Sequence, residues 1–254
     1  MKIEVEKATL EVELSGDSSR PSLMLWHGAG CSLRMWDHVI EYLGNRFNII
    51  SFDVRGVGQS SEGRDSRTQY TFEQYSKDAN CILDHLGLDQ THIWSMAWGS
   101  RAAMAYCSLN PKKVISAVFS DASIGVADVE AQKFGAKKAF LKQSESGVEV
   151  FIKPNGWNEH LNQKTVLMAL AAAGKFNLNN AIKYLSMPIM VMTGDHDPNL
   201  DSSKEIVKLL PNAKLVILED VGHGSILQRP DLTSKKFIEF HDSLETKNGK
   251  IDGA

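Results

Sequence analysis

Nearly continuous apolar runs alternate with helical patterns along almost the whole chain. SLMLW at residues 22–26, FNIISF at 47–52 and HIWSM at 92–96 are runs of this kind, and they are typical of strands that helices cover on both faces. Further runs occupy residues 114–119, 189–192 and 215–218, and an opening hairpin is expected over 2–5 and 9–14. The alternation predicts an α/β fold with a mostly parallel sheet of eight strands flanked by helices.

Local signals indicate where several helices begin and end. Thr71 and Gln74 form a capping box, in which each side chain satisfies a free backbone amide of the first turn. A second box of the same type at residues 202–205 predicts another helix start. Residues 98–110 are apolar and small on almost every side, so we expect a buried helix that ends before Pro111.

One long segment interrupts the alternation. Residues 124–185 contain no convincing core strand, and helical patterns dominate there, over 130–143, 165–173 and 178–185. We therefore expect a small helical cap at 124–185, inserted into an α/β core formed by residues 1–123 and 186–247. Residues 248–254 are expected to be a disordered tail.

Composition excludes several classes of function. The 28 basic and 31 acidic residues leave a net charge of −3, which argues against a nucleic-acid partner because phosphate binding requires a clustered positive field. No apolar run reaches the length of about 18 residues that a membrane helix needs, and the opening residues do not resemble a signal peptide. The three cysteines lie far apart without CxxC spacing, so neither a disulfide framework nor a zinc knuckle is expected. We expect a cytoplasmic protein.

Two glycine-containing motifs follow predicted strands. In HGAG, residues 27–30, the glycines allow a tight turn whose backbone amides point into a cleft and suit an oxyanion, although an ordinary strand-to-helix turn would look the same. DVRGVGQS, residues 53–60, lacks the third glycine of a dinucleotide-binding loop. We therefore expect Asp53, Arg55 and Ser60 to hold that loop through hydrogen bonds, which is a structural role.

The pentapeptide SMAWG, residues 95–99, lies between a predicted strand and the buried helix. A nucleophile elbow places its serine at the centre of such a turn, with small residues two positions before and after. Ser95 and Gly99 meet that steric requirement, but the central residue is Ala97, whose methyl group cannot attack a substrate. Read alone, the pentapeptide fits a plain turn equally well.

Two further motifs follow the last two predicted strands. GDHDP, residues 194–198, carries carboxylates, and Gly222-His223-Gly224 carries an imidazole. A general base needs an imidazole oriented by a carboxylate, and loops at neighbouring strand ends can bring the two together. A metal site at residues 195–197 is less favoured, because no second cluster lies at ligand spacing. His223 by itself would more often be structural.

Taken together, these motifs resemble the α/β-hydrolase fold family, serine-hydrolase type, over nearly the whole chain. HGAG, DVRGVGQS, the pentapeptide, GDHDP and the final Gly-His follow the family's order at the expected strand ends. The resemblance implies position 97 as nucleophile, Asp197 as triad acid and His223 as triad base. It also implies an oxyanion hole formed by the backbone amides of Ala29 and Trp98, and it requires neither metal nor organic cofactor.

Ala97 departs from the family, since it removes the attacking oxygen. We interpret it as an engineered serine-to-alanine replacement in an active parent, because the acid, the base and both amide positions are intact. The Ala97 form would then be nearly inactive. One alternative is a natural pseudo-hydrolase that binds a small molecule without converting it. A cofactor-free lyase, oxygenase or C–C hydrolase on the same fold is the other.

The substrate is the least determined feature. A small carboxylic ester or lactone, cleaved through an acyl-enzyme, is the expectation that the resemblance favours. Trp36 and Met96 are candidate pocket residues, although such side chains more often belong to the core. Arg101 is a candidate partner for a substrate carboxylate, with a surface or helix-packing role as the alternative. The sequence indicates no oligomeric state.

Overall fold

The computed structural model describes residues 1–63 and 66–248. The last helix, α10 (Pro230–Asn248), includes the first residue of the expected tail. Residues 249–254, the remainder of that tail, lie outside the described residues.

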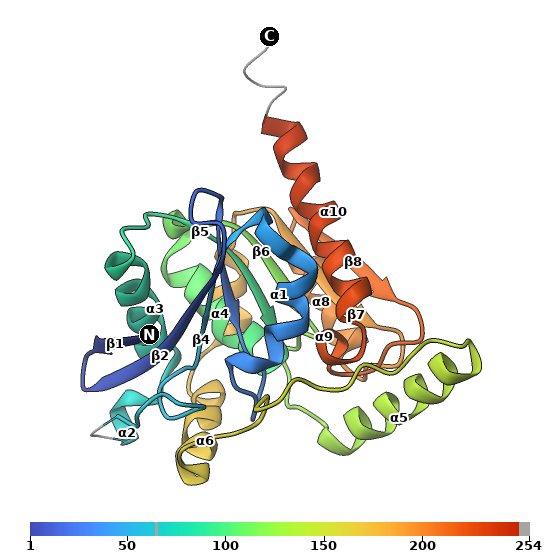
Figure 1. Cartoon of the computed structure of the whole chain (residues 1–254), viewed down its shortest axis with the longest axis horizontal. Coiled ribbons are helices and arrows are strands. Elements are labelled where there is room, and N and C mark those ends of the chain that lie inside the picture. Colours follow the sequence, from blue (N-terminus) through green and yellow to red (C-terminus); the bar gives the residue numbers. More distant parts are fainter. Residues whose placement is uncertain (64–65, 249–254) are drawn as a thin grey trace.

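The core is one eight-stranded sheet with the strand order β1-β2-β4-β3-β5-β6-β7-β8 (Figure 1). β1 pairs with β2 and β2 with β4 in antiparallel fashion, and every pair from β4 to β8 is parallel. This confirms the predicted fold. The strands are β1 (Lys2–Val5), β2 (Ala8–Gly16), β3 (Ser22–Trp26), β4 (Asn48–Phe52), β5 (Thr91–Met96), β6 (Val114–Ser120), β7 (Ile189–Gly194) and β8 (Ala213–Leu218).

The parallel register places the predicted motifs at one edge of the sheet. Trp26 of β3 lies opposite Ser95 of β5, and Met96 lies opposite Ser120 of β6. Ser120 in turn lies opposite Met192 of β7. The loops that leave these strands therefore emerge side by side, which is where parallel sheets build ligand sites.

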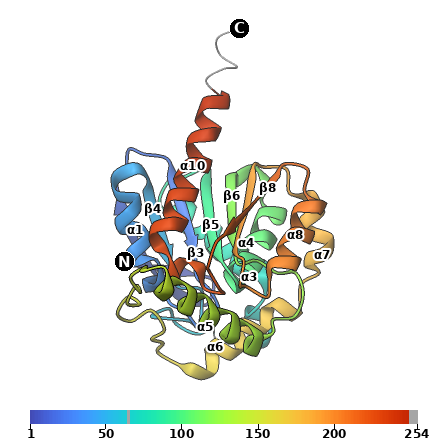
Figure 2. The same cartoon turned by 90° about the vertical axis from the view of Figure 1, so that its right-hand side faces the viewer.

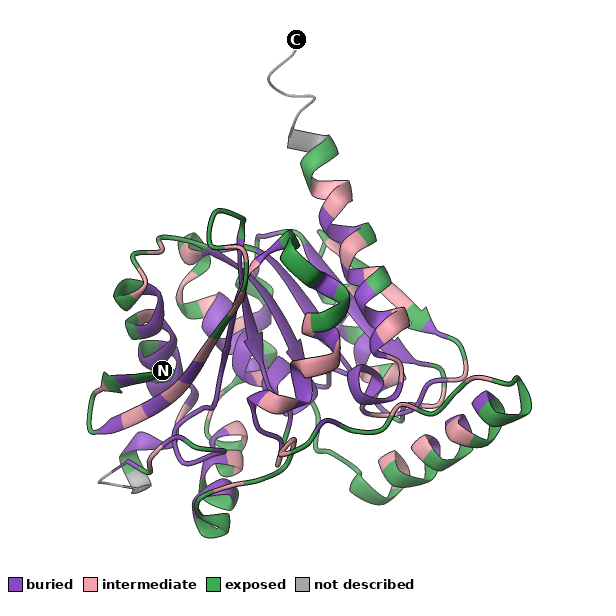
Figure 3. Ribbon diagram, in the orientation of Figure 1, coloured by how far each residue is buried: buried purple, intermediate pink, exposed green. Residues whose placement is uncertain are grey.

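Helices cover both faces of the sheet (Figure 2). α1 and α10 pack together on one face, and α3, α4 and α8 lie on the other. Alternate side chains of each central strand enter the two cores, so the strands are buried along their length (Figure 3). Within the described ranges, no helix combines the length and apolar character that crossing a bilayer requires. These helices are α1 (Asp37–Leu43), α3 (Phe72–His85), α4 (Trp98–Leu109) and α8 (Leu200–Leu209), with the shorter α2 (Ser66–Gln69) and α9 (Ser225–Gln228).

The segment between β6 and β7 is helical, as the patterns predict. It contains α5 (Val129–Glu145), α6 (Gln163–Leu170) and α7 (Leu178–Ala181), with 3₁₀ turns at Ala171–Gly174 and Ile182–Tyr184. Hydrogen bonds fasten it to loops of the core: the Thr165 hydroxyl donates to the carbonyl of Gly56, and the Ser32 hydroxyl donates to that of Gly156. The segment thus lies beside the loops that follow β3 and β4.

The two predicted capping boxes have different outcomes. The Thr71 side chain accepts a hydrogen bond from the backbone N–H of Gln74 at 3.1 Å, which confirms the first helix start. The second prediction is wrong, because α8 begins at Leu200 and residues 202–205 lie inside it. The Ser203 hydroxyl donates instead to the carbonyl of Ala122 at 2.9 Å. A tertiary contact with the segment after β6 therefore explains the serine.

Arg55 and Asp78 form a buried ion pair between the loop after β4 and α3. Arg55 donates from Nε and Nη2 to the two carboxylate oxygens at 2.7 and 2.5 Å. The side chains are 0% and 3% exposed, respectively. This matches the structural role expected for Arg55.

Removing one partner of this pair leaves a buried charge without compensation. We expect Asp78→Asn to lower the free energy of unfolding by about 3–5 kcal/mol, the usual cost of breaking a buried ion pair. Chemical denaturation measures this change. Glu130→Gln is the matched control, because Glu130 pairs with Lys133 in solvent and should change stability little. Equal effects of the two substitutions would contradict the structural role of the Arg55–Asp78 pair.

Candidate active site

Ala97 occupies a sharp turn between β5 and α4. Its backbone has φ 53° and ψ −113°, and its N–H donates to the carbonyl of Ser120 at 2.8 Å. Such a conformation is strained for any residue with a Cβ and persists only where the surroundings impose it. The turn thus has the form expected of an elbow, with a methyl group at its centre.

The small residues that flank Ala97 are required by close packing. A Cβ at Gly99 would collide with the carbonyl oxygen of His27, so α4 lies directly against the end of β3. Ser95 is fully buried, and its hydroxyl lies 3.1 Å from the carbonyl oxygen of Val118. The steric pattern read from the sequence therefore has a physical cause at both positions.

The loop after β3 is held rigidly beside this turn. The His27 ring donates from Nδ1 to the carbonyl of Gly28 at 3.0 Å and accepts at Nε2 from the N–H of Val54 at 3.1 Å. Burial lowers the pKa of His27 to about 4, so the ring is neutral at pH 7. In the described part of the chain, neither the backbone N–H of Ala29 nor that of Trp98 donates a hydrogen bond. Both amides are therefore available as donors.

Asp53 and His160 fasten the segment after β3 to the loop after β4. The Asp53 carboxylate accepts from the N–H groups of Leu33 and Gln59 at 2.7 and 2.8 Å. His160 reaches in from the inserted segment, where Nδ1 accepts from the Gly58 N–H at 2.9 Å and Nε2 donates to the Gly30 carbonyl at 3.1 Å. Sequence reasoning missed His160, since no local pattern marks a histidine in a loop as such a bridge.

Asp197 and His223 meet as the sequence predicts for an acid and a base. Nδ1 of His223 lies 3.2 and 3.1 Å from the two carboxylate oxygens of Asp197. The Asp197 carboxylate is buried, and it also accepts from the N–H of Asn199 at 2.9 Å and the hydroxyl of Thr193 at 3.2 Å. These bonds fix the carboxylate in the orientation that the imidazole needs.

The environment of His223 favours its charged form. Burial lowers the pKa of the ring, but the hydrogen bond to Asp197 and the charges of Asp121 and Asp197 outweigh burial. The pKa of His223 is therefore raised above its ordinary value of 6.5. An imidazole with such a pKa can accept a proton near neutral pH.

Contacts on two sides fix the loop that carries His223. A Cβ at Gly222 would collide with the backbone of Ala136, so the loop lies directly against α5. The Gln228 amide accepts from the N–H of Gly222 at 3.1 Å and donates to the carbonyl of His223 at 2.7 Å. The imidazole is thus presented from a fixed backbone.

A short path of hydrogen bonds joins this loop to the elbow. The Ser120 carbonyl accepts the N–H of Ala97, and the next residue, Asp121, accepts at Oδ2 from the N–H groups of Gly224 and Ser225 at 2.9 and 2.7 Å. The turn at Ala97 and the backbone after His223 therefore bond to two adjacent residues, Ser120 and Asp121, at the end of β6. Sequence reasoning missed Asp121, although a carboxylate directly after a buried strand at this edge was the available signal.

The candidate pocket residues lie in different environments. Trp36 is 0% exposed and packs edge-on against Trp94 with ring centres 5.4 Å apart, so it belongs to the hydrophobic core. Met96 is also buried, and its side chain packs directly against Gly28. Arg101 is half-buried on α4 and has no ion-pair partner among the described residues.

Trp98 connects the site to the inserted segment. Its ring stacks on that of His27 with centres 6.4 Å apart, and its Nε1 donates to the carbonyl of Leu170 at the end of α6. Tyr75 of α3 donates in the same way to the neighbouring carbonyl of Ala169. The bulky residue after position 97 therefore anchors the inserted helices.

Among the described residues, three clusters of side chains present three possible metal ligands each, and two of these clusters lie in the loops after β6, β7 and β8. Asp121, Asp197 and His223 place ligand atoms within 4.8 Å of one another. Their carboxylates, however, already accept backbone N–H groups, and Asp197 also accepts from the imidazole. The second cluster, Asp195, His196 and Asp220, is more exposed and has the same spacing.

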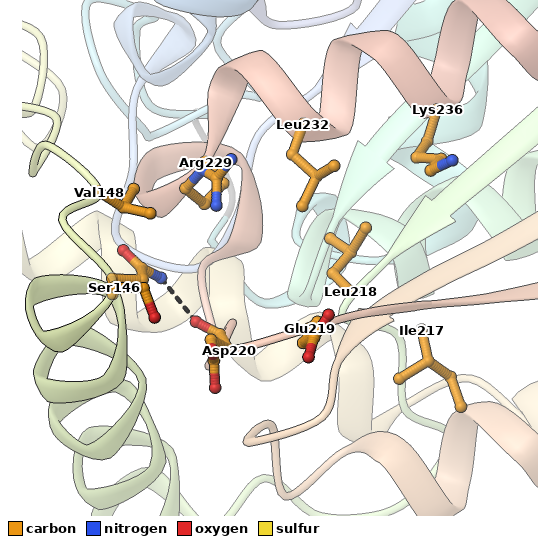
Figure 4. A pocket seen from close by; sticks show the side chains of 10 residues that line it. Ser146, Val148, Ile217, Leu218, Glu219, Asp220, Arg229, Leu232 and Lys236 are labelled. Atoms are coloured by element: carbon orange, nitrogen blue, oxygen red, sulfur yellow. Dashed lines mark hydrogen bonds between the residues drawn. The ribbon is translucent and has the colours of Figure 1, made fainter.

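The groove in Figure 4 lies apart from the turn at Ala97 and from the Asp197–His223 pair. It has a volume of about 460 Å³ and runs between the end of α5, β8 and the start of α10. Val148, Leu218 and Leu232 contribute its apolar lining, and its Arg229 is already paired with Asp231 at 2.8 Å. Neither Ala97 nor His223 lines it, so the groove is separate from the candidate site.

Known proteins resemble this chain in sequence. A family model described as alpha/beta hydrolase fold matches residues 21–145. A relative named "Putative carbamate hydrolase RutD", from Agrobacterium fabrum, is 23% identical over 255 residues, which cover 91% of this chain and 96% of the relative. Carboxylesterase YbfK of Bacillus subtilis is 22% identical over 246 residues, which cover 89% of this chain and 82% of the relative.

Solved structures show the same architecture. The enol-lactonase from Burkholderia xenovorans superposes with a TM-score of 0.78 at 18% identity, covering 95% of this chain and 100% of that chain. A thermophilic esterase from Thermogutta terrifontis superposes with a TM-score of 0.74 at 18% identity, covering 96% and 98%. The sheet order, the family match and these superpositions agree, and the chain has the alpha/beta hydrolase fold.

Proposed function

We propose that this fold carries a serine-hydrolase site whose nucleophile position is residue 97. The observation that carries the proposal is the Asp197–His223 pair, with Nδ1 of the imidazole 3.1 Å from a buried carboxylate oxygen, at the same edge of the parallel sheet as the positive-φ turn at Ala97. Nucleophile, base and acid at successive strand ends, in this chain order, are the arrangement of the triad in this fold.

With a serine at 97, each group has a defined role. The serine oxygen attacks the substrate carbonyl while Nε2 of His223 takes its proton, since Nδ1 is held by Asp197. The free backbone amides of Ala29 and Trp98 stabilise the oxyanion. The imidazolium then protonates the leaving alkoxide, and water hydrolyses the acyl-enzyme by the same route.

A small carboxylic ester or lactone is the substrate class that we propose. Two relatives in fold are named an enol-lactonase and an esterase, and a relative in sequence is named a carboxylesterase. The inserted helices cover the loops beside the site and would shape the acyl or alcohol pocket.

We further propose that Ala97 replaces a serine. The conformation at φ 53° and ψ −113° is strained for an alanine, whose methyl group has no chemical role there. The same turn presents a reacting side chain to the substrate. Cys31 offers no substitute, because burial raises the pKa of its thiol to about 12 and the thiolate is the reactive form. A serine codon at position 97 of the parent gene would establish the replacement directly.

Restoring the hydroxyl tests the proposed reaction. We expect Ala97→Ser to raise kcat for p-nitrophenyl acetate, p-nitrophenyl butyrate or a small lactone by several orders of magnitude. In a comparable triad, the nucleophile contributes about 10⁶-fold. Release of nitrophenolate, or of acid from the lactone, measures the rate.

The matched control is the double variant Ala97→Ser with His223→Ala, which has the hydroxyl but no base and should stay near the rate of the Ala97 form. A single Ala97→Ser variant that remains at background on esters and lactones would contradict the hydrolase proposal. Tight binding of such compounds without turnover would favour a non-catalytic binding protein.

The pH dependence follows from the raised pKa of His223. In the Ala97→Ser variant the imidazole must be neutral to accept a proton, so kcat/KM should fall as the pH decreases through a midpoint above 6.5. Adding Asp197→Asn removes the charge that raises this pKa, so we expect a lower midpoint and a rate reduced by about 10⁴-fold. A midpoint below 6.5 in the single variant would contradict this electrostatic account.

The strain at residue 97 predicts an unusual effect of glycine. Replacing a helical alanine by glycine costs about 1 kcal/mol, and Ala103→Gly in the same helix should lower the free energy of unfolding by at least that amount. Ala97→Gly should change it far less, because glycine adopts a positive φ without strain. Denaturant titration compares the two variants, and equal losses would show that residue 97 is not strained.

A further inference from the structure

Asp121 combines two features that each cost stability. It is fully buried, and it is one of only four non-glycine residues with positive φ among the described residues, at 52°. Its Oδ2 accepts from the N–H groups of Gly224 and Ser225, and its Oδ1 has no hydrogen-bond partner among the described residues. A buried carboxylate kept in this state calls for a functional explanation.

The position of the carboxylate relates it to the acid and the base. Oxygens of Asp121 and Asp197 and a ring nitrogen of His223 all lie within 4.8 Å of one another. Asn199 bonds to both aspartates, because its side-chain amide donates to the backbone carbonyl of Asp121 at 2.9 Å while its backbone N–H donates to the carboxylate of Asp197 at 2.9 Å. Two carboxylates therefore face one imidazole.

The charges of these three groups are mutually dependent. Burial, followed by the charge of Asp197, raises the pKa of Asp121 to about 7, and His223 opposes that rise. Asp121 in turn is one of the charges that raise the pKa of His223. Groups that interact this strongly titrate together over a shared range.

We propose that Asp121 is a positioning residue of this site, which fixes the backbone directly after His223 and adds a second negative charge that favours the protonated imidazole. The proposal rests on the role of His223 proposed above. Asp121 transfers no proton and contacts no substrate; it acts through the imidazole. Two backbone N–H groups hold the carboxylate in place, and its free oxygen leaves the charge available to the ring.

The titration of His223 tests the proposal. It can be followed in the Ala97 chain itself, so the test does not depend on catalytic activity. We expect Asp121→Asn to lower the pKa of His223, followed by NMR of its ring protons, by roughly one unit, at the lower end of the effect of an opposite charge within 4–6 Å. An asparagine retains an oxygen that accepts the two backbone N–H groups, so the loop keeps its anchor while the charge is lost.

Asp195→Asn is the matched control. The Asp195 carboxylate also holds this loop, accepting from the N–H of Val221 at 3.2 Å, but it is exposed and lies beside His196. This variant should leave the pKa of His223 unchanged. An unchanged pKa in Asp121→Asn, or equal shifts in both variants, would overturn the proposal.

The backbone part of the proposal has its own measurement. Hydrogen exchange at the amides of Gly224 and Ser225 should stay slow in Asp121→Asn and become much faster in Asp121→Ala. If the asparagine variant does not fold, the unmodified chain provides the test: because Asp121 and His223 titrate over a shared range, the ring signals of His223 should follow a titration curve that a single protonation does not fit. A curve that a single protonation fits would overturn the proposal.

Activity separates this proposal from the hydrolase proposal. In the Ala97→Ser background, Asp121→Asn should move the acid midpoint of kcat/KM downward by the same amount as the NMR pKa. A lower rate with an unchanged midpoint would overturn the charge role and leave only a structural one. An inactive Ala97→Ser variant would refute the hydrolase while leaving the His223 titration as a valid test of Asp121.

Discussion

The parallel register of β3, β5, β6 and β7 is the constraint on which the site depends. Because these strands end together, the loops that follow them emerge at one edge of the sheet, and residues more than a hundred positions apart become neighbours. The single backbone bond from Ala97 N–H to the Ser120 carbonyl then couples the elbow to the end of β6. Asp121, the next residue, accepts hydrogen bonds from the backbone N–H groups of Gly224 and Ser225, which directly follow His223.

Close backbone packing keeps these loops rigid. Glycines at 99, 194 and 222 lie where any side chain would collide with a neighbouring main chain. Buried polar groups supply the rest, since Asp53, Asp121 and Asp197 each accept backbone N–H groups from loops of this edge. Rigidity of this kind matters for catalysis because an oxyanion hole and a base act only when they are already in place.

Much of this arrangement was predictable from the sequence, because apolar runs and turn motifs are local signals. The strand runs predict the sheet, and a polar motif after each of several strands predicts that Asp197 and His223 meet. Contacts between distant segments have no such signal. Residues 202–205 imitate a helix start but lie inside α8, where Ser203 bonds to Ala122. His160 and Asp121 are likewise recognisable only from the groups that they bridge.

The most direct test of the central claim is an experimental structure of the Ala97 form with an ester or lactone bound. Without a nucleophile the ligand should remain intact. Its carbonyl carbon should lie against the methyl group of Ala97, with the carbonyl oxygen within hydrogen-bonding distance of the Ala29 and Trp98 amides and the ester oxygen facing His223. A ligand bound instead in the groove of Figure 4, or with its carbonyl turned away from these amides, would contradict the account.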